Sequence, residues 1–322
     1  KYLILAAVSA AFLLFGMALV YADLGTMEFA RMAAQSSGNN QTIFLAGLAM
    51  IIIGVGFKLA VVPFHMWTPD IYEGAPAPVT AFVATVSKGA MFALLLRYFS
   101  GMRIQNSASL FLVFALIAIA SMFVGNLLAL MQNNVKRILA YSSIAHLGYL
   151  LVAFLAGGRR GAISVAFYLV AYFVTTLSAF GVITLLSGEK RDADMMEDYR
   201  GLFWRRPWLA SIFAAALLSL AGIPMTAGFV GKFYILAAGV GSALWLLVII
   251  MIVNSAIGLY YYLRIVVAMY RDSAREISVA VPTLSFAGSA ALAGLTLLLV
   301  WLGVYPSPLI CIIQAVIERF IE

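Results

Sequence analysis

Long apolar segments recur along the whole chain, and they restrict the solvent in which it can fold. A helix needs about 20 mostly apolar residues to cross a bilayer. The segments that satisfy this requirement cover residues 2–21, 42–65, 78–100, 108–131, 136–156, 161–187, 207–239, 242–270 and 280–304. Hydrophobic residues make up 64% of the chain and charged residues 10%, whereas soluble domains average about 45–50% and about 25%. We therefore predict an all-α polytopic membrane protein with about nine transmembrane helices.

The two ends of the chain differ from its other apolar segments. The first segment is longer than the roughly 7–15 apolar residues of a signal peptide. Because the chain enters this segment directly from Lys1, without a Met, we expect it to be the C-terminal part of a longer protein. The last stretch, "LICIIQAVIERFIE" (309–322), is short and amphipathic. We predict that it lies along the membrane interface instead of crossing the bilayer.

The segment 207–239 is too long for one straight crossing and contains Gly222, Pro224 and Gly228. Proline removes a backbone donor and clashes with the preceding turn, so we predict a broken helix between Gly222 and Gly228. Exposed backbone at membrane depth is tolerated only where protein or a water-filled cavity covers it, and such breaks mark transport sites. A simple proline kink is the alternative, but Lys232 follows the break directly.

Basic residues are unevenly divided between the two sides of the membrane if the nine spans alternate. The connections after spans two, four, six and eight share a side with the N-terminus, and the positive-inside rule places that side in the cytoplasm. This side carries Lys136, Arg137, Lys190, Arg191, Arg200, Arg205, Arg206, Arg271 and Arg275, and the other carries Arg31, Arg103, Arg159, Arg160 and Arg319. The longest polar connection, 187–207, holds five basic and five acidic residues. It is either a docking segment for a neighbour or a solvated loop.

Several classes of function find no support in the sequence. The net charge of +7 arises mostly from basic residues that flank apolar segments, where they orient the chain and meet anionic lipid, so no nucleic-acid partner is expected. The single Cys311 excludes a disulfide framework and a cysteine-held cluster within this chain. Nucleotide, zinc and redox motifs of the types G-x-G-x-x-G, Walker A, H-E-x-x-H and CxxC are absent. The two histidines alone do not support a haem.

Ionisable residues deep in the spans are all basic or histidine. They are Lys58, Lys88, His146 and Lys232, with Lys1 and His65 nearer to span ends. A charge at the bilayer centre costs at least about 2.5–3.5 kcal/mol, so four such residues on separate spans indicate a function. Burial disfavours the charged form of lysine, and a buried lysine can therefore exchange a proton near neutral pH. Histidine can relay a proton through either ring nitrogen, although a lone buried histidine is as often structural.

Three segments resemble the antiporter-like membrane subunits of respiratory complex I. The first is "GFKLAVVPFHMWTPDIYEGAPAPVTAFVATVSKGAMFALLLRYF" (56–99), in which Lys58, His65, Pro69, Asp70 and Lys88 fall on the family's pattern. The others are "VKRILAYSSIAHLGYLLVA" (135–153) and "SLAGIPMTAGFVGKFYIL" (219–236), the latter preceded by "YRGLFWRRPWLA". The resemblance extends over essentially the whole chain. Some members of the family carry glutamate at the position of Lys232.

This resemblance implies an inverted-repeat, antiporter-like fold in which each half contains a broken helix with a key charge. "KYLILAA" (1–7) matches "KFYILAA" (232–238) at five of seven positions, so Lys1 and Lys232 are expected to be equivalent. Lys58 and Lys88 would continue a polar axis along the membrane midplane, with His65 and His146 beside it. The family's glutamate that pairs with the residue matching Lys1 is absent, so we expect further helices before Lys1. The expected parts are 1–65 as the end of the first half-channel, 66–270 as the second with its broken helix 207–239, and 271–322 as a span with an amphipathic segment.

The resemblance also implies a function. The chain would belong to a non-redox, proton-translocating subunit of a bacterial NADH:quinone oxidoreductase in the plasma (inner) membrane, without an active site of its own. Its proton-transfer residues would be Lys1, Lys58, Lys88 and Lys232, with His65 and His146 as possible relays. No cofactor is expected in this chain, because NADH, FMN, iron–sulfur clusters and quinone would sit on other subunits. Partners would be those membrane subunits, including other antiporter-like ones, and lipid. The alternatives are a subunit of a multisubunit cation/proton antiporter and a purely structural membrane subunit.

Overall fold

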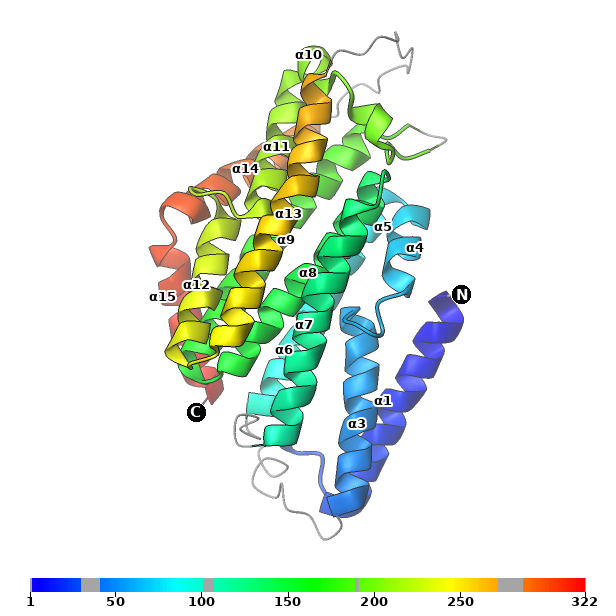
Figure 1. Cartoon of the computed structure of the whole chain (residues 1–322), viewed down its shortest axis with the longest axis vertical. Helices are drawn as coiled ribbons and strands as arrows, with labels where there is room; N and C mark the ends of the chain where they lie inside the picture. Colours follow the sequence, from blue (N-terminus) through cyan, green and yellow to red (C-terminus); the bar gives the residue numbers. More distant parts are fainter. Residues whose placement is uncertain (1, 30–40, 101–106, 189–190, 272–285, 322) are drawn as a thin grey trace.

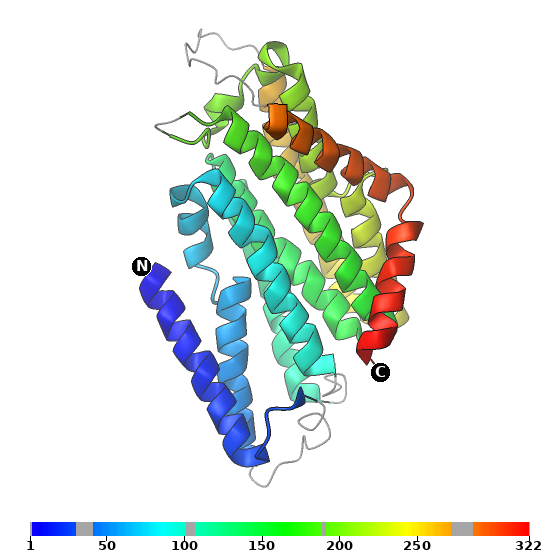
Figure 2. The same ribbon diagram turned by 180° about the vertical axis from the view of Figure 1, so that it is seen from behind.

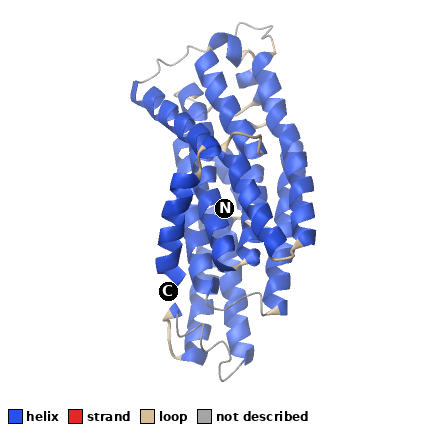
Figure 3. Cartoon of the chain, turned by 90° about the vertical axis from the view of Figure 1, so that its left-hand side faces the viewer, coloured by secondary structure: helices blue, strands red, loops and turns tan. Residues whose placement is uncertain are grey.

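The computed structural model describes residues 2–29, 41–100, 107–188, 191–271 and 286–321. In these ranges the regular structure is entirely helical, and most helices run back and forth along one elongated bundle (Figures 1 and 3). The connections after the second, fourth and sixth predicted spans meet at one end of the bundle, the upper end in Figure 1. The alternation of sides expected from the sequence is therefore present in the fold.

Eight helices of the described residues are long and apolar enough to cross a membrane. They are α1 (Tyr2–Leu24), α3 (Gln41–Leu59), the continuous α5 (Ala77–Phe82), η1 (Val83–Ser87) and α6 (Lys88–Ser100), then α7 (Ala108–Leu130), α8 (Val135–Ala156), α9 (Gly158–Leu186), α13 (Trp245–Tyr270) and α14 (Phe286–Val304). The remaining predicted span is split into α11 (Pro207–Ala221) and α12 (Ala227–Gly241). The shorter elements are α4 (Trp67–Gly74), η3 (Met196–Tyr199), α10 (Leu202–Arg205) and α15 (Ser307–Ile321).

Helix α8 lies at the centre of the bundle, and all of its residues except Arg137 are buried. It packs closely on α7, because glycines let the two backbones approach each other. A Cβ added at Gly125 would lie 2.7 Å from the carbonyl oxygen of Tyr141, and one added at Gly148 would lie 2.9 Å from that of Ala118. Small residues at such crossings are typical of membrane helices. The polar side chains of α8 consequently face other helices instead of lipid.

The predicted break between Gly222 and Gly228 is confirmed. Helix α11 ends at Ala221, and Gly222 follows in the left-handed region with a φ of 87°, which glycine adopts without a steric penalty. Helix α12 begins after Thr226, whose side chain accepts a hydrogen bond from the Phe229 N–H. The break lies between the two ends of the bundle, where the α11 and α12 ribbons separate in Figure 1.

Two predicted spans are interrupted in ways that we did not expect. The span 42–65 is wrong at its C-terminal end, because α3 stops at Leu59 and Ala60 takes a φ of 61°. Pro63 disfavours helical geometry in the residue before it, so His65 lies in the turn before α4 and not on the helix of Lys58. The span 78–100 changes into one π-helical turn, Val83–Ser87, immediately before Lys88.

The two flanks of the bundle are formed by the ends of the chain. Helices α1 and α3 pair along one edge, and α14 with α15 covers the opposite edge (Figures 1 and 2). The interfacial position expected for the last segment stays a prediction. Helix α15 begins after Tyr305 and Pro306 and packs on α9, with Ile313 and Ile317 buried in the same apolar cluster as α9 residues. Part of its apolar face is therefore covered by the bundle.

Candidate functional site: buried lysines around a central histidine

Lys232 lies on α12 one turn beyond the break, and its side chain reaches back to the open end of α11. Its ammonium group donates hydrogen bonds to the carbonyl oxygens of Leu220 (2.9 Å) and Ala221 (2.8 Å) and to the Ser255 hydroxyl on α13 (2.9 Å). The side chain is 7% exposed. The last carbonyls of a helix are unpaired and carry the negative end of its dipole, so the broken helix itself supplies the partner for this cation.

A cavity of about 270 Å³ adjoins Lys232 between α11, α12 and α13. Its polar lining includes Ser255 and Lys232, and the rest is apolar. Phe233 and Ile252, at 60% and 51% exposed, form part of its wall. The cavity therefore reaches the side surface of the bundle. It adjoins Lys232 on the side away from α8, since none of its lining residues belongs to that helix.

Lys88 follows the π-helical turn and is 1% exposed. Its ammonium group donates a hydrogen bond to the Ser143 hydroxyl on α8 and lies 5.4 Å from the centre of the Tyr72 ring. The Tyr72 hydroxyl is also 3.4 Å from the Ser143 oxygen. π-Helical turns often occur at functional sites, and this one aims a lysine at the central helix.

His146 lies on α8 between these two lysines, and both are close enough to interact with it electrostatically. Its Nδ1 is 2.5 Å from the Tyr168 hydroxyl and its Nε2 is 3.0 Å from the Tyr262 hydroxyl. The imidazole is thus held at both nitrogens inside the bundle. We call these three residues the Lys88–His146–Lys232 cluster.

An amide-centred network lies next to this cluster. Asn126 on α7 donates from its Nδ2 to the Tyr149 hydroxyl (3.1 Å) and to Asn254 Oδ1 (3.3 Å). Its Oδ1 accepts a hydrogen bond of 2.9 Å from the Tyr261 hydroxyl. The Tyr149 ring lies 5.4 Å from the Lys232 ammonium nitrogen. Helices α7, α8 and α13 are therefore joined by polar contacts at the level of the lysines.

The other predicted site residues are less tightly integrated. Lys58 lies one residue before the end of α3 and is half-buried. His65 is 7% exposed, and neither of its ring nitrogens has a hydrogen-bond partner among the described residues. Lys1 lies outside the described residues, so its equivalence to Lys232 stays a prediction. Within the described part of the chain, α3 ends one residue after Lys58, and α1 is continuous.

Within the described ranges, no carboxylate forms an ion pair with Lys88 or Lys232. The ion pairs of these ranges belong to other basic residues, namely Lys136, Arg137, Arg159 and Arg191. The same ranges contain no group of acidic, histidine and cysteine side chains that could hold a metal ion. The ammonium groups are stabilised by hydroxyls, carbonyls and aromatic rings, which do not neutralise the charge.

A charged network at the upper end of the bundle fixes the helices that carry the cluster. Lys136, in the first turn of α8, is 1% exposed although the sequence indicated a cytoplasmic flank. Its ammonium group binds the carbonyl oxygens of Glu73 (3.0 Å) and Ala75 (2.6 Å) and the Asp192 carboxylate (2.6 Å). The 187–207 connection thus packs on its own bundle.

Within this connection, η3 and its neighbours are held by their own contacts. Arg191 binds Asp198 at 2.7 Å, and hydrogen bonding to that carboxylate raises the pKa of the guanidinium group. Tyr199 is fully buried and its ring stacks on Phe213 of α11. The connection is therefore anchored near the start of the broken helix.

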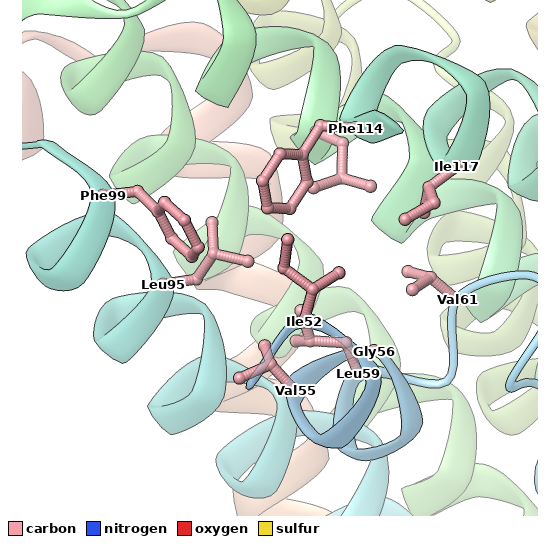
Figure 4. Close-up of a pocket in the computed structure, with 10 residues that line it drawn as sticks. Ile52, Val55, Gly56, Leu59, Val61, Leu95, Phe99, Phe114 and Ile117 are labelled. Atoms are coloured by element: carbon pink, nitrogen blue, oxygen red, sulfur yellow. The ribbon is translucent and has the colours of Figure 1, made fainter. Parts of the chain in front are cut away.

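A second, much smaller cavity of about 10 Å³ lies between α3, α6, α7 and α8 (Figure 4). The side chains of Ile52, Leu95, Phe99 and Phe114 converge on it, and its lining is apolar. An apolar cavity of this kind stays dry. Its lining offers no group for proton transfer.

Sequence reasoning missed several residues that contact the cluster or form the network next to it. Tyr168, Tyr262 and Ser255 were not selected, because hydroxyl side chains are common in apolar helices and gave no distinctive pattern. Asn126 and Asn254 had a usable signal, since each is an amide in the middle of an otherwise apolar segment. Buried polar groups in a membrane require partners, and such amides indicate a helix–helix contact.

The fold and the site together define a class: a polytopic, all-helical membrane protein with lysines buried around a broken helix. The sequence profile of one family, described as "NADH:quinone oxidoreductase/Mrp antiporter, TM", matches residues 1–258. The chain belongs to this family.

Curated relatives support this assignment. A protein of Nitrosospira multiformis named NADH-quinone oxidoreductase subunit N is 56% identical over 98% of this chain and 66% of its own length. Proteins of the same name from Methylococcus capsulatus and Ectopseudomonas mendocina are 51% and 50% identical, each over 96% of this chain and 63% and 64% of their own length. The chain thus spans slightly less than two thirds of the length of these relatives.

Solved structures show the same fold. Respiratory complex I from Thermus thermophilus with bound aureothin contains a chain with 36% identity and a TM-score of 0.81, covering 96% of this chain and 67% of that one. The Mrp complex from a Dietzia species matches with a TM-score of 0.86 at 21% identity over 97% of this chain and 66% of that one, which shows the fold alone. The predicted fold class and the localisation as a multi-pass protein of the bacterial inner membrane are confirmed.

Proposed function

We propose that this chain is part of a proton-translocating membrane subunit of a bacterial NADH:quinone oxidoreductase. The observation that carries the proposal is the position of Lys232, buried at the end of a broken helix and bound by three neutral oxygen atoms. Neutral acceptors leave the charge uncompensated, so the ammonium group responds to other charges that arrive nearby. The identity to relatives named subunit N favours this function over others with the same fold.

The Lys88–His146–Lys232 cluster supplies a physical route for coupling. A proton gained by Lys88 adds a positive charge near His146, which disfavours a charge on the imidazole, and His146 in turn interacts electrostatically with Lys232. Lys232 can then release its proton toward the adjoining cavity. Moving one charge across 100 mV takes about 2.3 kcal/mol, and like-charge repulsion between buried groups is of comparable size. The energy would come from electron transfer elsewhere in the complex.

The proposal includes the division of labour in the complex. This chain would carry no redox centre and no active site of its own, with NADH, FMN, iron–sulfur clusters and quinone bound by other subunits. Its neighbours would be membrane subunits of the same complex. Residues 1–65 would belong to the first half-channel and 66–270 to the second, with Lys58 and His65 at the boundary between them and Lys1 in the first.

A cation/proton antiporter subunit is the second candidate, because the family and the fold include the Mrp complex. It would use the same lysines but would transport sodium without NADH. A structural subunit is the third candidate, and it requires that the lysines be dispensable.

Lys232→Ala in the complete oxidoreductase complex separates these candidates. In inverted membrane vesicles we expect NADH-driven proton pumping to fall on the order of 10²-fold, the scale of a lost acid–base group, while native gels show normal assembly. Arg160→Ala, which removes an exposed positive charge, is the control and should pump normally. Full pumping by assembled Lys232→Ala complex would refute the proposal, and sodium-dependent transport without NADH would favour the antiporter.

A further inference from the structure

Tyr262 joins His146 to a serine of the same helix, and the proposed function assigns it no role. It lies on α13, is 1% exposed, and its hydroxyl contacts two groups of α8. One is the Ser142 hydroxyl, and the other is Nε2 of His146 at 3.0 Å. Ser142 adjoins Ser143, which binds the Lys88 ammonium group. A single hydroxyl of α13 thus connects the histidine to the serine pair on the Lys88 side.

The contacts at both imidazole nitrogens determine how His146 can work. A neutral imidazole carries one donor and one acceptor nitrogen, and the contact at one nitrogen fixes the role of the other. With Tyr262 at Nε2 and Tyr168 at Nδ1, the two tautomers correspond to two directions of the same hydrogen-bonded chain. Removing the Tyr262 hydroxyl opens this chain at the Nε2 end only.

We propose that Tyr262 is a positioning residue for proton transfer, which orients His146 and sets its tautomer through the hydrogen bond at Nε2. The inference rests on the proposed function, since it assigns Tyr262 a role within that route. In one arrangement the Tyr262 hydroxyl donates to Nε2 and Nδ1–H donates to the Tyr168 hydroxyl. After a proton has passed, both hydrogen bonds point the other way, so that Tyr168 donates to Nδ1 and Nε2–H donates to Tyr262. Tyr262 acts through His146 and has the same protonation state before and after one transfer.

Tyr261 provides a matched control on the same helix. It is also 1% exposed, and its ring lies 4.4 Å from that of Tyr262. Its hydroxyl, however, binds Asn126 and not His146. Tyr261→Phe and Tyr262→Phe therefore remove the same atom from similar surroundings, and only the second change removes a hydrogen bond of the histidine.

The test is a double-mutant cycle in the assembled complex, measured as NADH-driven pumping in inverted vesicles. We expect Tyr262→Phe to slow pumping about fivefold, the equivalent of one neutral hydrogen bond, and Tyr261→Phe to leave it within twofold. His146→Gln should slow it more, and the Tyr262→Phe, His146→Gln double variant should match His146→Gln alone. Coupling of this kind marks residues that act through one another.

A purely structural Tyr262 gives different results. The effects of Tyr262→Phe and His146→Gln on pumping would then multiply in the double variant, or Tyr261→Phe would slow pumping as much as Tyr262→Phe. Either result overturns the inference. Replacing Tyr262 by 3-fluorotyrosine keeps the hydroxyl and should restore pumping, and a failure to restore it counts equally against the proposal. Lys232→Ala is measured in parallel. If it pumps normally, the proposed function fails. If it is inactive while Tyr262→Phe pumps normally, only this inference fails.

Discussion

Gly228→Ala tests whether the contact between the two halves of the broken helix holds Lys232 in place. A Cβ at Gly228 would lie 2.7 Å from the carbonyl carbon of Ser219 on α11 and nearer still to its oxygen. Backbone atoms cannot rotate away from such a contact as a flexible side chain can. The end of α11 must therefore move away from the start of α12, and overpacking of this kind costs about 1–3 kcal/mol.

The displacement also acts on the site. The Ser219 hydroxyl accepts a hydrogen bond from the Gly228 N–H at 3.0 Å, and the next two carbonyls of α11 bind Lys232. Moving these carbonyls weakens two hydrogen bonds to a charged group, each contributing about 1.5–3 kcal/mol. Loss of even one corresponds to roughly a tenfold change in an equilibrium, since about 1.4 kcal/mol is a factor of ten.

The assay compares pumping and thermal inactivation of the assembled complex in membrane vesicles. We expect Gly228→Ala to lower pumping at least about tenfold and to inactivate at a lower temperature. Gly241→Ala at the other end of α12 is the matched control, because its added Cβ would meet Arg160 Nη1 at 3.5 Å, an ordinary contact. Normal pumping and normal thermal stability of Gly228→Ala would show that the end of α11 does not hold the lysine.

Three further predictions rest on the contacts of the lysines. Ser255→Ala removes one of the three acceptors of Lys232 and should reduce pumping about tenfold without loss of assembled complex; unchanged pumping would contradict it. Lys136→Met removes the cation that binds Asp192 and should destabilise the complex by about 3 kcal/mol, seen as a lower inactivation temperature. Lys88→Ala should impair pumping more than Lys58→Ala, because Lys88 is buried against Ser143 whereas Lys58 is half-buried; the reverse order in vesicle assays would contradict this.

The transmembrane architecture could be predicted because its signals are local. A run of apolar residues determines a span wherever it occurs, and Gly222 and Pro224 break a helix through their own backbone chemistry. The same reasoning should have ended α3 early, since Pro63 stands in "KLAVVPFHMW". The apolar residues around Pro63 concealed the break, because a turn covered by protein can be as hydrophobic as a helix.

The details of the site could not be predicted, because they depend on contacts between distant residues. Tyr262 is 116 positions from His146, and no spacing rule relates them. The π-helical turn before Lys88 contains no glycine or proline that would signal it in the sequence, and it packs against the distant α9. Lys136 is buried because Asp192, far along the chain, folds over it.

The neutral partners of Lys232 determine how its proton can be controlled. A carboxylate partner can swing away or take up a proton itself, so either event can release a lysine. The carbonyls of α11 can do neither, since they are fixed in the backbone and do not titrate in this range. Two ways then remain to change the stability of the ammonium group: a shift of α11 against α12, or the arrival of another positive charge. The contact of Gly228 with Ser219 restricts the first, whereas His146, which interacts electrostatically with both Lys88 and Lys232, supplies the second. Control by neighbouring charges is therefore the mode that this geometry favours.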